Sequence, residues 1–196
     1  MGRVVQATIE AVRDVGYAAT TIKEICTRAG VSQGGLFRHF GTRHDVIVAA
    51  ADEVARRQAD AFARDLQGVD GDPVEAAVRA ARARCHSPMN AVWHELMVAC
   101  RTDPELRAAV APAADRYHEA IEALAQGVLG EVLPAGVAAS AAWYVIHCFD
   151  GEAVASTLLA DPDGADPMGN AAGLTQEDLD LAQVLGIVMG AIDQSQ

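Results

Sequence analysis

Apolar residues recur along most of the chain at spacings of three and four, which places them on one face of a helix. Val5, Ile9 and Val12 begin this pattern, and Gly16 is expected to end the first helix. No segment alternates like a strand, and no internal repeat is present. The sequence therefore predicts an all-α protein of about nine helices. After the first, the expected helices cover residues 21–29, 32–39, 42–67, 73–86, 90–102, 104–131, 136–160 and 175–193.

The segment between residues 20 and 43 predicts a helix-turn-helix. Thr21 begins a capping box, in which its hydroxyl accepts from the backbone N–H of Glu24 while the Glu24 carboxylate reaches back. Gly30 follows this helix and tolerates the left-handed conformation at a helix end. Ser32 then caps a short third helix. Two helices joined in this way place the second where it can enter the major groove of DNA.

The outward face of the short third helix carries two glycines. When the helix is projected, Leu36 and Phe40 face the core, and Gln33 lies in the exposed first turn. Gly34 and Gly35 occupy the outward face, although alanine would stabilise a helix there. Glycines are useful at these positions if the backbone must approach base edges and thymine methyl groups. The alternative is a loose turn in a helical protein.

Charge is unevenly distributed along the chain. The 196 residues carry a formal net charge of −12, yet residues 1–48 hold six basic and four acidic side chains. The remainder holds nine basic and 23 acidic side chains. A locally basic region on an acidic protein is compatible with nucleic-acid binding, which the total charge alone would argue against.

The composition, with 51% hydrophobic and 21% charged residues, is that of a globular protein. Its apolar stretches are too short or too interrupted to cross a bilayer, so we expect a soluble protein with no membrane partner. The four cysteines lie far apart and form no C-x-x-C pair, which predicts neither a disulfide framework nor a zinc knuckle. A reducing cytoplasm is the expected location.

Catalytic and metal-binding patterns are incomplete. His94 and Glu95 begin an H-E-x-x-H zinc pattern, but Val98 stands where the second histidine is required. Cys85 and His86 are adjacent and therefore point in different directions on a helix. The sequence contains no phosphate-binding loop, dinucleotide-binding glycine pattern or nucleophile elbow. We expect no metal site, no cofactor and no enzymatic activity.

The segment from Thr20 to Phe40, TTIKEICTRAGVSQGGLFRHF, resembles the DNA-binding signature of the tetracycline-repressor (TetR) family of bacterial transcriptional regulators. The resemblance covers roughly residues 3–50. It implies a helix-turn-helix DNA-binding domain at residues 1–45 and an effector-binding and dimerisation domain at residues 46–196. It further implies a homodimeric repressor that binds a palindromic operator in double-stranded DNA and is released by a small-molecule effector.

The resemblance also assigns DNA contacts to individual residues. Thr21 and Arg43 match positions that contact phosphates, and Gln33 and Gly34 match positions that read bases. Phe37 replaces the tyrosine more often found there, so a phenolic hydroxyl that could bind phosphate is lost. The predicted DNA-binding residues are Thr21, Lys23, Ser32, Gln33, Gly34, Gly35, Phe37, Arg38, His39 and Arg43.

Aromatic and apolar stripes in the second domain are candidates for an effector pocket. Such stripes are more often plain core, but the resemblance favours a pocket because the corresponding helices of the family surround one. The predicted ligand-binding residues are Trp93, Met97, Cys100, Tyr117, Ile121, Trp143, His147 and Asp150. Arg101, Arg116 and His118 are further candidate polar groups, together with Asp150.

The last two predicted helices are expected to form a homodimer interface. The helix at 175–193 is apolar on more than one side, so it must be buried on more than one side. Small residues in the helix at 136–160 allow close approach around a twofold axis. The alternative is that the apolar surface packs on the protein's own core. The predicted interface residues are Trp143, Val154, Leu181, Val184, Leu185, Val188 and Ile192.

Two other functions remain open at the level of sequence. The first is a constitutive helix-turn-helix dimer whose second domain holds no effector, which a fully packed interior would favour. The second is an all-α small-molecule carrier or metal-dependent enzyme with an incidental helix-turn-helix, which an absence of DNA binding would favour.

Overall fold

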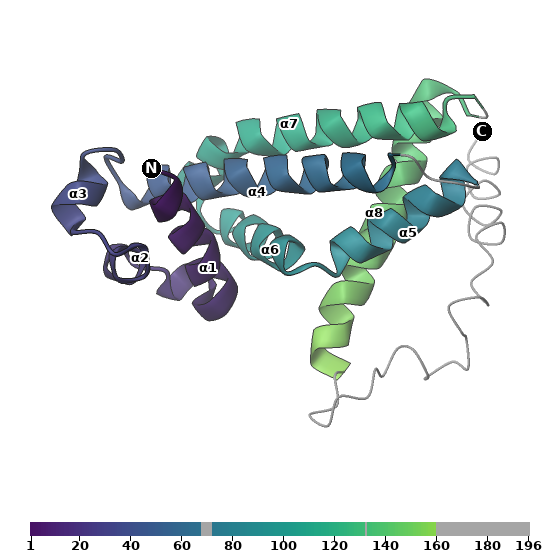
Figure 1. Cartoon of the computed structure of the whole chain (residues 1–196). Coiled ribbons are helices and arrows are strands. Elements are labelled where there is room, and N and C mark those ends of the chain that lie inside the picture. Colours follow the sequence, from purple (N-terminus) through teal and green to yellow (C-terminus); the bar gives the residue numbers. More distant parts are fainter. Residues whose placement is uncertain (68–71, 132, 160–196) are drawn as a thin grey trace.

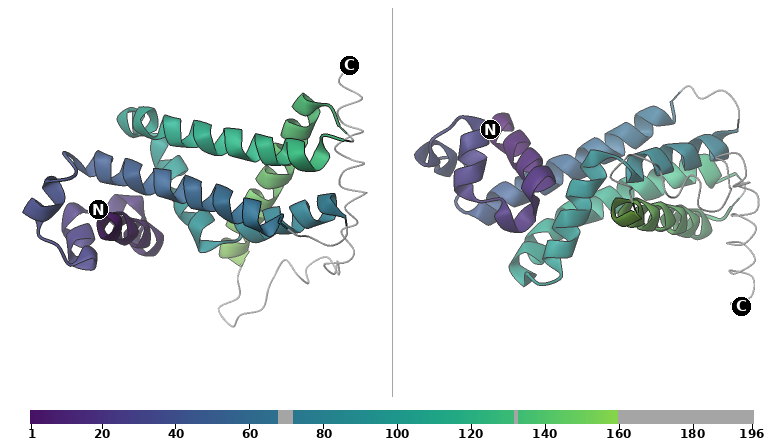
Figure 2. Two further views of the ribbon diagram at one scale, coloured as in Figure 1. Left: turned by 45° about the horizontal axis from the view of Figure 1, so that its top comes forward. Right: turned by 90° about the horizontal axis from the view of Figure 1, so that it is seen from below.

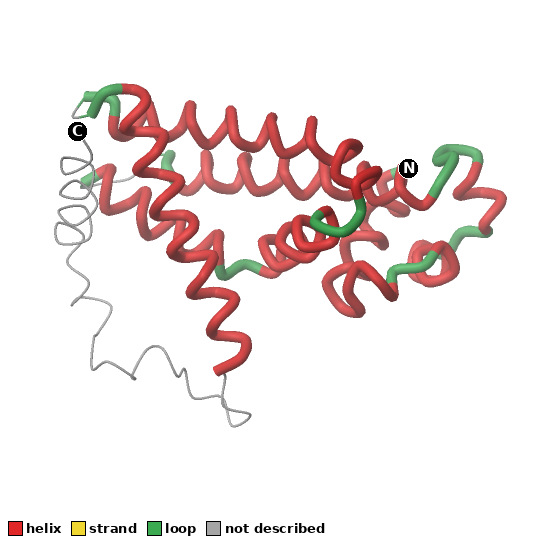
Figure 3. Tube along the Cα trace, turned by 180° about the vertical axis from the view of Figure 1, so that it is seen from behind, coloured by secondary structure: helices red, strands yellow, loops and turns green. Residues whose placement is uncertain are grey.

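The computed structural model describes residues 1–67, 72–131 and 133–159. Within these ranges the chain forms eight helices and no strand, which confirms the predicted all-α class (Figure 1, Figure 3). The ninth predicted helix, at 175–193, lies outside the described residues. The helices are α1 (Gly2–Ala19), α2 (Ile22–Ala29), α3 (Gln33–Phe37), α4 (Arg43–Asp65), α5 (Pro73–Cys85), α6 (Pro88–Cys100), α7 (Pro104–Leu129) and α8 (Ala135–Leu159).

The first three helices form a small unit, here called the head, at one end of the molecule (Figure 1). Leu36 of α3 is fully buried, and Phe40 is buried just beyond it, as the periodicity predicted. Both belong to a core that combines α1, α2, α3 and the first turn of α4. Its members are Val4, Ala7, Ile25, Cys26, Ala29, Leu36, Phe40 and Val46. The head therefore has a hydrophobic core of its own.

Local hydrogen bonds fix the ends of α2 and α3. The Thr21 hydroxyl accepts from Glu24 N at 3.1 Å, and the Ser32 hydroxyl accepts from Gly35 N at 3.0 Å. Gly30 ends α2 with a φ of 62°, the left-handed conformation expected of a glycine there. The predicted capping box differs in one respect, because the Glu24 carboxylate accepts from Arg28 Nε at 2.7 Å. A charged guanidinium is a stronger partner for a carboxylate than a backbone N–H.

α4 joins the head to the rest of the protein as one continuous helix (Figure 2). A full capping box starts it: Thr42 N donates to Asp45 Oδ2 at 2.9 Å, and Asp45 N donates to the Thr42 hydroxyl at 3.1 Å. The first turns of α4 contact the head through Val46, and its last turns reach Phe62 in a second core at the far end. α4 also packs along α7. Both ends of the molecule are thus built on the same helix.

The first helix breaks at Gly16, where the sequence predicted its end, but it continues for a further turn to Ala19. Gly16 has φ 77° and ψ 166°, a conformation that side chains do not tolerate. The break directs the backbone N–H of Tyr17 at α6, where it donates to Glu95 Oε1 at 2.7 Å. The Thr20 hydroxyl donates to the Gly16 carbonyl at 2.7 Å. This junction ties the head to α6.

Four helices meet at the end of the molecule away from the head (Figure 1, Figure 2). α8 lies across the C-terminal part of α7 and contacts α5, which also contacts α4. Their buried apolar side chains form a separate core cluster of Phe62, Ala80, Ala81, Cys85, Ile121 and Ile146. The apolar cavity described below lies among these four helices.

Candidate functional site

The outward face of α3 is open to solvent. A side-chain carbon added at Gly34 would meet nothing within 4 Å, and Phe37 is 47% exposed. Gly35 is half-buried, and a carbon added there would lie 3.3 Å from the Ser32 hydroxyl. The predicted DNA-binding residues that are exposed are Thr21, Lys23, Ser32, Gln33, Gly34, Phe37, Arg38 and His39. These residues lie in α2 and α3 or immediately next to them. Both helices lie at the end of the head that points away from the rest of the protein (Figure 1).

One basic side chain of the head is neutralised within the protein. Arg28 Nη1 lies 2.6 Å from Asp14 Oδ2, and Arg28 Nε lies 2.7 Å from Glu24 Oε1. Hydrogen bonds from Arg13 and Arg28 lower the pKa of the exposed Asp14 carboxyl to about 2. Arg28 therefore holds α1 against α2, and its charge is balanced without a phosphate.

Arg43, at the start of α4, is half-buried against the end of α1. Its Nε donates to the Thr20 carbonyl at 2.8 Å, and its Nη2 donates to the Tyr17 carbonyl at 2.5 Å. The guanidinium carbon lies 4.2 Å from the centroid of the Tyr17 ring, in a cation–π arrangement. Arg43 thus satisfies carbonyls at the end of α1 and fixes how α1 meets α4. Its phosphate contact stays a prediction.

Asp103, just before α7, forms a second junction between the head and the rest of the protein. Its Oδ2 lies 3.1 Å from His44 Nε2 and accepts from the Tyr17 hydroxyl at 3.3 Å. Its Oδ1 accepts from Leu106 N at 2.9 Å and caps α7. This backbone hydrogen bond, with the nearby His44, holds the pKa of the Asp103 carboxyl below its usual value. Tyr17 is therefore held by α4, α6 and the start of α7 together.

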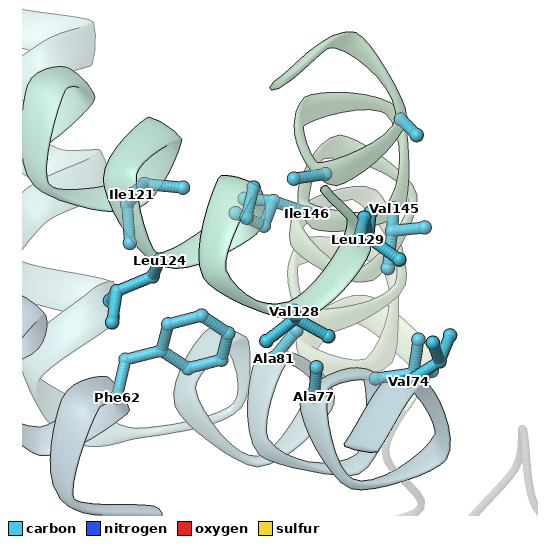
Figure 4. Close-up of a pocket in the computed structure, with 14 residues that line it drawn as sticks. Phe62, Val74, Ala77, Ala81, Ile121, Leu124, Val128, Leu129, Val145 and Ile146 are labelled. Atoms are coloured by element: carbon cyan, nitrogen blue, oxygen red, sulfur yellow. The ribbon is translucent and has the colours of Figure 1, made fainter. Parts of the chain in front are cut away.

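An apolar cavity of about 50 Å³ lies between α4, α5, α7 and α8 (Figure 4). Figure 4 shows Phe62 reaching across from α4 towards Val128 of α7 and Ala81 of α5. Every side chain on its wall is a hydrocarbon. The wall consists of Phe62, Val74, Ala77, Val78, Ala81, Ile121, Leu124, Ala125, Val128, Leu129, Ala141, Ala142, Val145 and Ile146. Such a site can bind an apolar group by excluding water.

A smaller cavity of about 10 Å³ adjoins it and is lined by both apolar and polar side chains. Phe62, Ala81, Ile121 and Ile146 line both cavities and so form the boundary between them. The other side chains of the smaller cavity are Gln58, Arg84, Cys85, Asn90 and Tyr117. The polar side chains of the smaller cavity thus lie beside a pocket whose wall is entirely hydrocarbon.

The structure distributes the predicted ligand-binding residues over three places. Ile121 lines both cavities, and Tyr117 lines the smaller one. Trp93 and Cys100 belong to the close-packed core between α4, α6 and α7, and Met97 packs against that core. These three residues line neither cavity. The apolar stripe that carries them is therefore core, the reading that the sequence left open.

The remaining predicted ligand-binding residues lie on α8 beside the cavities. Trp143 lies 6.1 Å from Tyr117 between ring centroids, and His147, which is exposed, stacks on Trp143 at 5.7 Å. Asp150 accepts from Asn90 Nδ2 at 2.9 Å and lies 3.2 Å from His94 Nε2. None of these three predicted residues lines either cavity.

Asp150 is the centre of a half-buried polar cluster between α6 and α8. Burial raises the pKa of its carboxyl, but the hydrogen bonds from His94 and Asn90 outweigh burial and leave that pKa below its usual value. The same contact with Asp150 raises the pKa of the His94 imidazole. Burial, reinforced by Asp150, also raises the pKa of the Cys85 thiol, so Cys85 stays protonated. The contacts of Asp150 with His94 and Asn90 join α6 to α8.

The other candidate polar groups lie outside the cavities. Arg101 and His118 are exposed, and Arg116 forms an exposed ion pair with Asp52. In the ranges that the structure covers, no three His, Cys, Asp or Glu side chains are grouped closely enough to hold a metal ion. Over the same ranges, no helix combines the length and the apolar character that a membrane crossing requires.

α8 carries large apolar side chains on its outer face. Tyr144 is 58% exposed and Val154 is 50% exposed. His147, Cys148 and Gly151 lie between them in sequence and are exposed as well. The predicted interface residue Val154 lies on this face, whereas the Trp143 ring contacts the rings of Tyr117 and His118 on α7. The other predicted interface residues, Leu181, Val184, Leu185, Val188 and Ile192, lie outside the described residues.

Sequence reasoning missed the cavity residues on α4 and α5. Phe62 and Ala81 lie on both cavity walls, and Gln58 lies on the wall of the smaller one. One signal was available for Gln58, since it falls four residues from Val54 and from Phe62 on the apolar face of α4. A polar residue at a core position of a helix is informative because it needs a partner.

Comparison with known proteins agrees with this architecture. Residues 4–50 match the family described as bacterial regulatory proteins, tetR family. An uncharacterized HTH-type transcriptional regulator of Mycobacterium tuberculosis is 36% identical over 171 residues, covering 83% of this chain and 85% of the relative.

Two solved structures establish the likeness of fold over most of the chain. A transcriptional regulator from a Rhodococcus species has a TM-score of 0.67 at 22% identity, with 96% of this chain and 94% of that one covered. A protein of Saccharomonospora viridis, assigned as a transcriptional regulator and solved with choline, has a TM-score of 0.65 at 17% identity, with 85% and 89% covered. Together with the sequence matches, these findings place the chain in the TetR family of helix-turn-helix transcriptional regulators, which bind DNA and are not enzymes.

Proposed function

We propose that the protein is a homodimeric repressor that binds a palindromic operator and is released by a small, mainly apolar effector. The observation that carries this proposal is the course of α4. Its first turn contributes Val46 to the core of the head, and Phe62 near its end lines the cavity. A ligand that displaces Phe62 moves the helix on which the head is mounted, which changes the separation of the two heads in a dimer.

α6 supplies a second connection between the cavities and the head. Asn90, near its start, lines the smaller cavity, and Glu95 accepts from Tyr17 N at 2.7 Å. Trp93 and Leu96, between and beside them, are buried in the core that α6 shares with α1 and α4. A shift of α6 therefore reaches α1 through one short hydrogen bond and close packing. In this proposal the effector acts by favouring a dimer whose heads no longer fit successive major grooves.

The DNA contacts of the proposal follow the exposed residues of the head. Gln33 and Gly34 face the bases from the first turn of α3, and Thr21 and Lys23 meet phosphates at the start of α2. Arg38 and His39 extend the contact surface beyond α3. Arg43 contributes mainly by holding α4 against α1, since two of its donors already bind the carbonyls of Thr20 and Tyr17.

Gly34→Ala is expected to raise the stability of the protein while it lowers the affinity for DNA. Alanine should stabilise α3 by about 0.5–1 kcal/mol, because glycine is a poor helix former and the added methyl meets nothing within 4 Å. The same methyl should weaken operator binding by about tenfold, or ~1.4 kcal/mol, if the backbone of α3 approaches the bases. Urea unfolding and DNA titration measure the two effects.

Gln33→Ala is the matched control, because it removes a side chain from the same exposed turn. It should relax sequence preference at one or two base pairs, at a cost of about 1–3 kcal/mol, instead of weakening binding to all sequences. A Gly34→Ala protein that binds the operator as tightly as the wild type would show that this face of α3 does not meet the bases.

Selection of bound duplexes from a random DNA pool tests the proposed function directly. The expected result is a palindrome whose affinity falls steeply with salt, since phosphate contacts release counterions. Small molecules are then screened for release of that duplex. Selection of a palindrome that no molecule releases would favour a constitutive DNA-binding dimer, and failure to select any sequence would contradict the proposal as a whole.

A further inference from the structure

Gln58 is a buried amide with no hydrogen-bond partner among the described residues. Its side chain is on the wall of the smaller cavity, and the residue is only 4% exposed. Neither Oε1 nor Nε2 makes a hydrogen bond, so the conclusion does not depend on which way the amide is turned. A buried amide left unpaired is costly, and such groups in proteins usually have a partner. The amide therefore leaves one acceptor and two donor hydrogens without a partner in a residue on the wall of the smaller cavity.

Gln58 lies next to the hydrocarbon pocket. Phe62 is one turn further along α4, and Phe62, Ala81, Ile121 and Ile146 are the walls shared by the two cavities. The smaller cavity, at about 10 Å³, has room for about one water-sized group, such as the oxygen or nitrogen at the end of a ligand, while the larger cavity extends away from it between α5, α7 and α8. A molecule that spans both must have a small polar end and an apolar remainder.

The charges around Gln58 already have partners. Arg84, on the same cavity wall, forms an ion pair with Asp65, with its Nε 3.1 Å from Asp65 Oδ2, although this buried Nε makes no hydrogen bond of good geometry. Asp150, beyond Cys85 and Asn90, is paired with His94 at 3.2 Å. A carboxylate entering the smaller cavity would have to compete with Asp65 for Arg84, and an ammonium group would have to compete with His94 for Asp150. Either charge would lose its hydration beside a charge that is already balanced. The polar end of the ligand is therefore uncharged.

The geometry points to an effector with an uncharged polar head that both donates and accepts hydrogen bonds, such as a primary amide, bound to Gln58, and with a hydrocarbon body in the larger cavity. This inference rests on the proposed function and specifies the chemical class of the effector. It also gives Gln58 a role in specificity, because only a ligand that both donates to Gln58 Oε1 and accepts from Gln58 Nε2 gives each of these atoms a hydrogen-bond partner. Straight-chain carboxamides are the simplest members of this class.

The test measures binding of a series from hexanamide to dodecanamide by calorimetry, with the matched carboxylates and alkylammonium ions. Wild-type protein is expected to bind the best amide at least tenfold more tightly than its charged counterparts. Gln58→Leu should weaken the amide by about tenfold and should not lower the melting temperature, because it removes an unpaired buried amide. Gln126→Leu, the same change at an exposed glutamine of α7, should leave amide binding unchanged.

DNA binding is measured in the same samples, so that the two proposals fail separately. Suppose that the protein binds the selected operator and that other molecules release it. If no amide then binds, or if Gln58→Leu binds the amide as tightly as the wild type does, the assignment of Gln58 is wrong but the proposed function stands. Tighter binding of a carboxylate than of its amide would make Arg84 the recognition residue and would also overturn the inference. If no operator is selected, the proposed function fails whatever the amides do.

Discussion

Gly16→Ala is expected to lower the free energy of unfolding by about 3 kcal/mol, whereas alanine at Gly34 or Gly127 should raise it. At φ 77° and ψ 166° the backbone lies in a region that is essentially restricted to glycine, and a side chain there costs of order 1–3 kcal/mol. The added carbon would also lie 3.0 Å from Glu95 Oε1. The carboxylate must then move and weaken its hydrogen bond to Tyr17 N, which adds to the backbone cost.

Gly127→Ala provides the matched control in urea unfolding. Gly127 lies inside α7, and a carbon added there meets nothing within 4 Å, so alanine should stabilise the protein by up to about 1 kcal/mol. The two substitutions make the same chemical change with opposite expected signs. Glu95→Gln, which keeps the size of the side chain, shows how much of the loss comes from the hydrogen bond. A Gly16→Ala protein as stable as the wild type would mean that the break in α1 is not fixed by glycine.

The same junction should matter for DNA binding, because it joins the head to α6. Tyr17 N is bound by Glu95, the Tyr17 carbonyl by Arg43, and the Tyr17 hydroxyl by Asp103. A change at Gly16 disturbs all three contacts at once and should loosen the head relative to the cavities. At a temperature where Gly16→Ala is still folded, we expect weaker operator binding and a smaller effect of any effector.

The sequence predicted the head well because its signals are local. The hydroxyls of Thr21 and Ser32 and the conformation of Gly30 depend on residues within one or two turns, and each was found as expected. Leu36 and Phe40 are buried because helical periodicity alone separates them from the outward glycines. The exception is Glu24, whose carboxylate turned to Arg28 because a charged partner in the same helix was in reach.

The cavities were harder to predict, because periodicity shows which face of a helix is buried but not which helix covers it. The stripe containing Trp93 was a reasonable candidate, yet it packs against α4 and α7 and lines neither of the two cavities described above. The cavity forms instead where α5 and α8 reach α4 and α7. Arg43 is a similar case, since its carbonyl partners lie 23 and 26 residues away in sequence. These contacts are set by the tertiary arrangement of helices.

Tyr144→Arg is expected to convert the proposed dimer into a monomer and to weaken binding to the full palindrome by a factor of about 10²–10⁴. Tyr144 and Val154 leave α8 with a large apolar surface in water, and a pair of such faces around a twofold axis would bury both. A palindromic operator needs two heads related by the same symmetry. An arginine on that face, close to the twofold axis of the proposed dimer, would bring two like charges together in a desolvated interface.

Val98→Arg is the matched control, because Val98 on α6 is 57% exposed and Tyr144 is 58% exposed. Placing the same charge on α6 should leave the dimer intact at micromolar concentration, as measured by sedimentation. Binding of Tyr144→Arg to a single half-site should remain close to that of the wild type, since the head is unchanged and only the second contact is lost. If Tyr144→Arg stays dimeric and binds the full palindrome normally, the twofold contact lies away from the outer face of α8. The exposed side chains of that helix would then require another partner, because large apolar groups gathered on one helix face are rarely left in water.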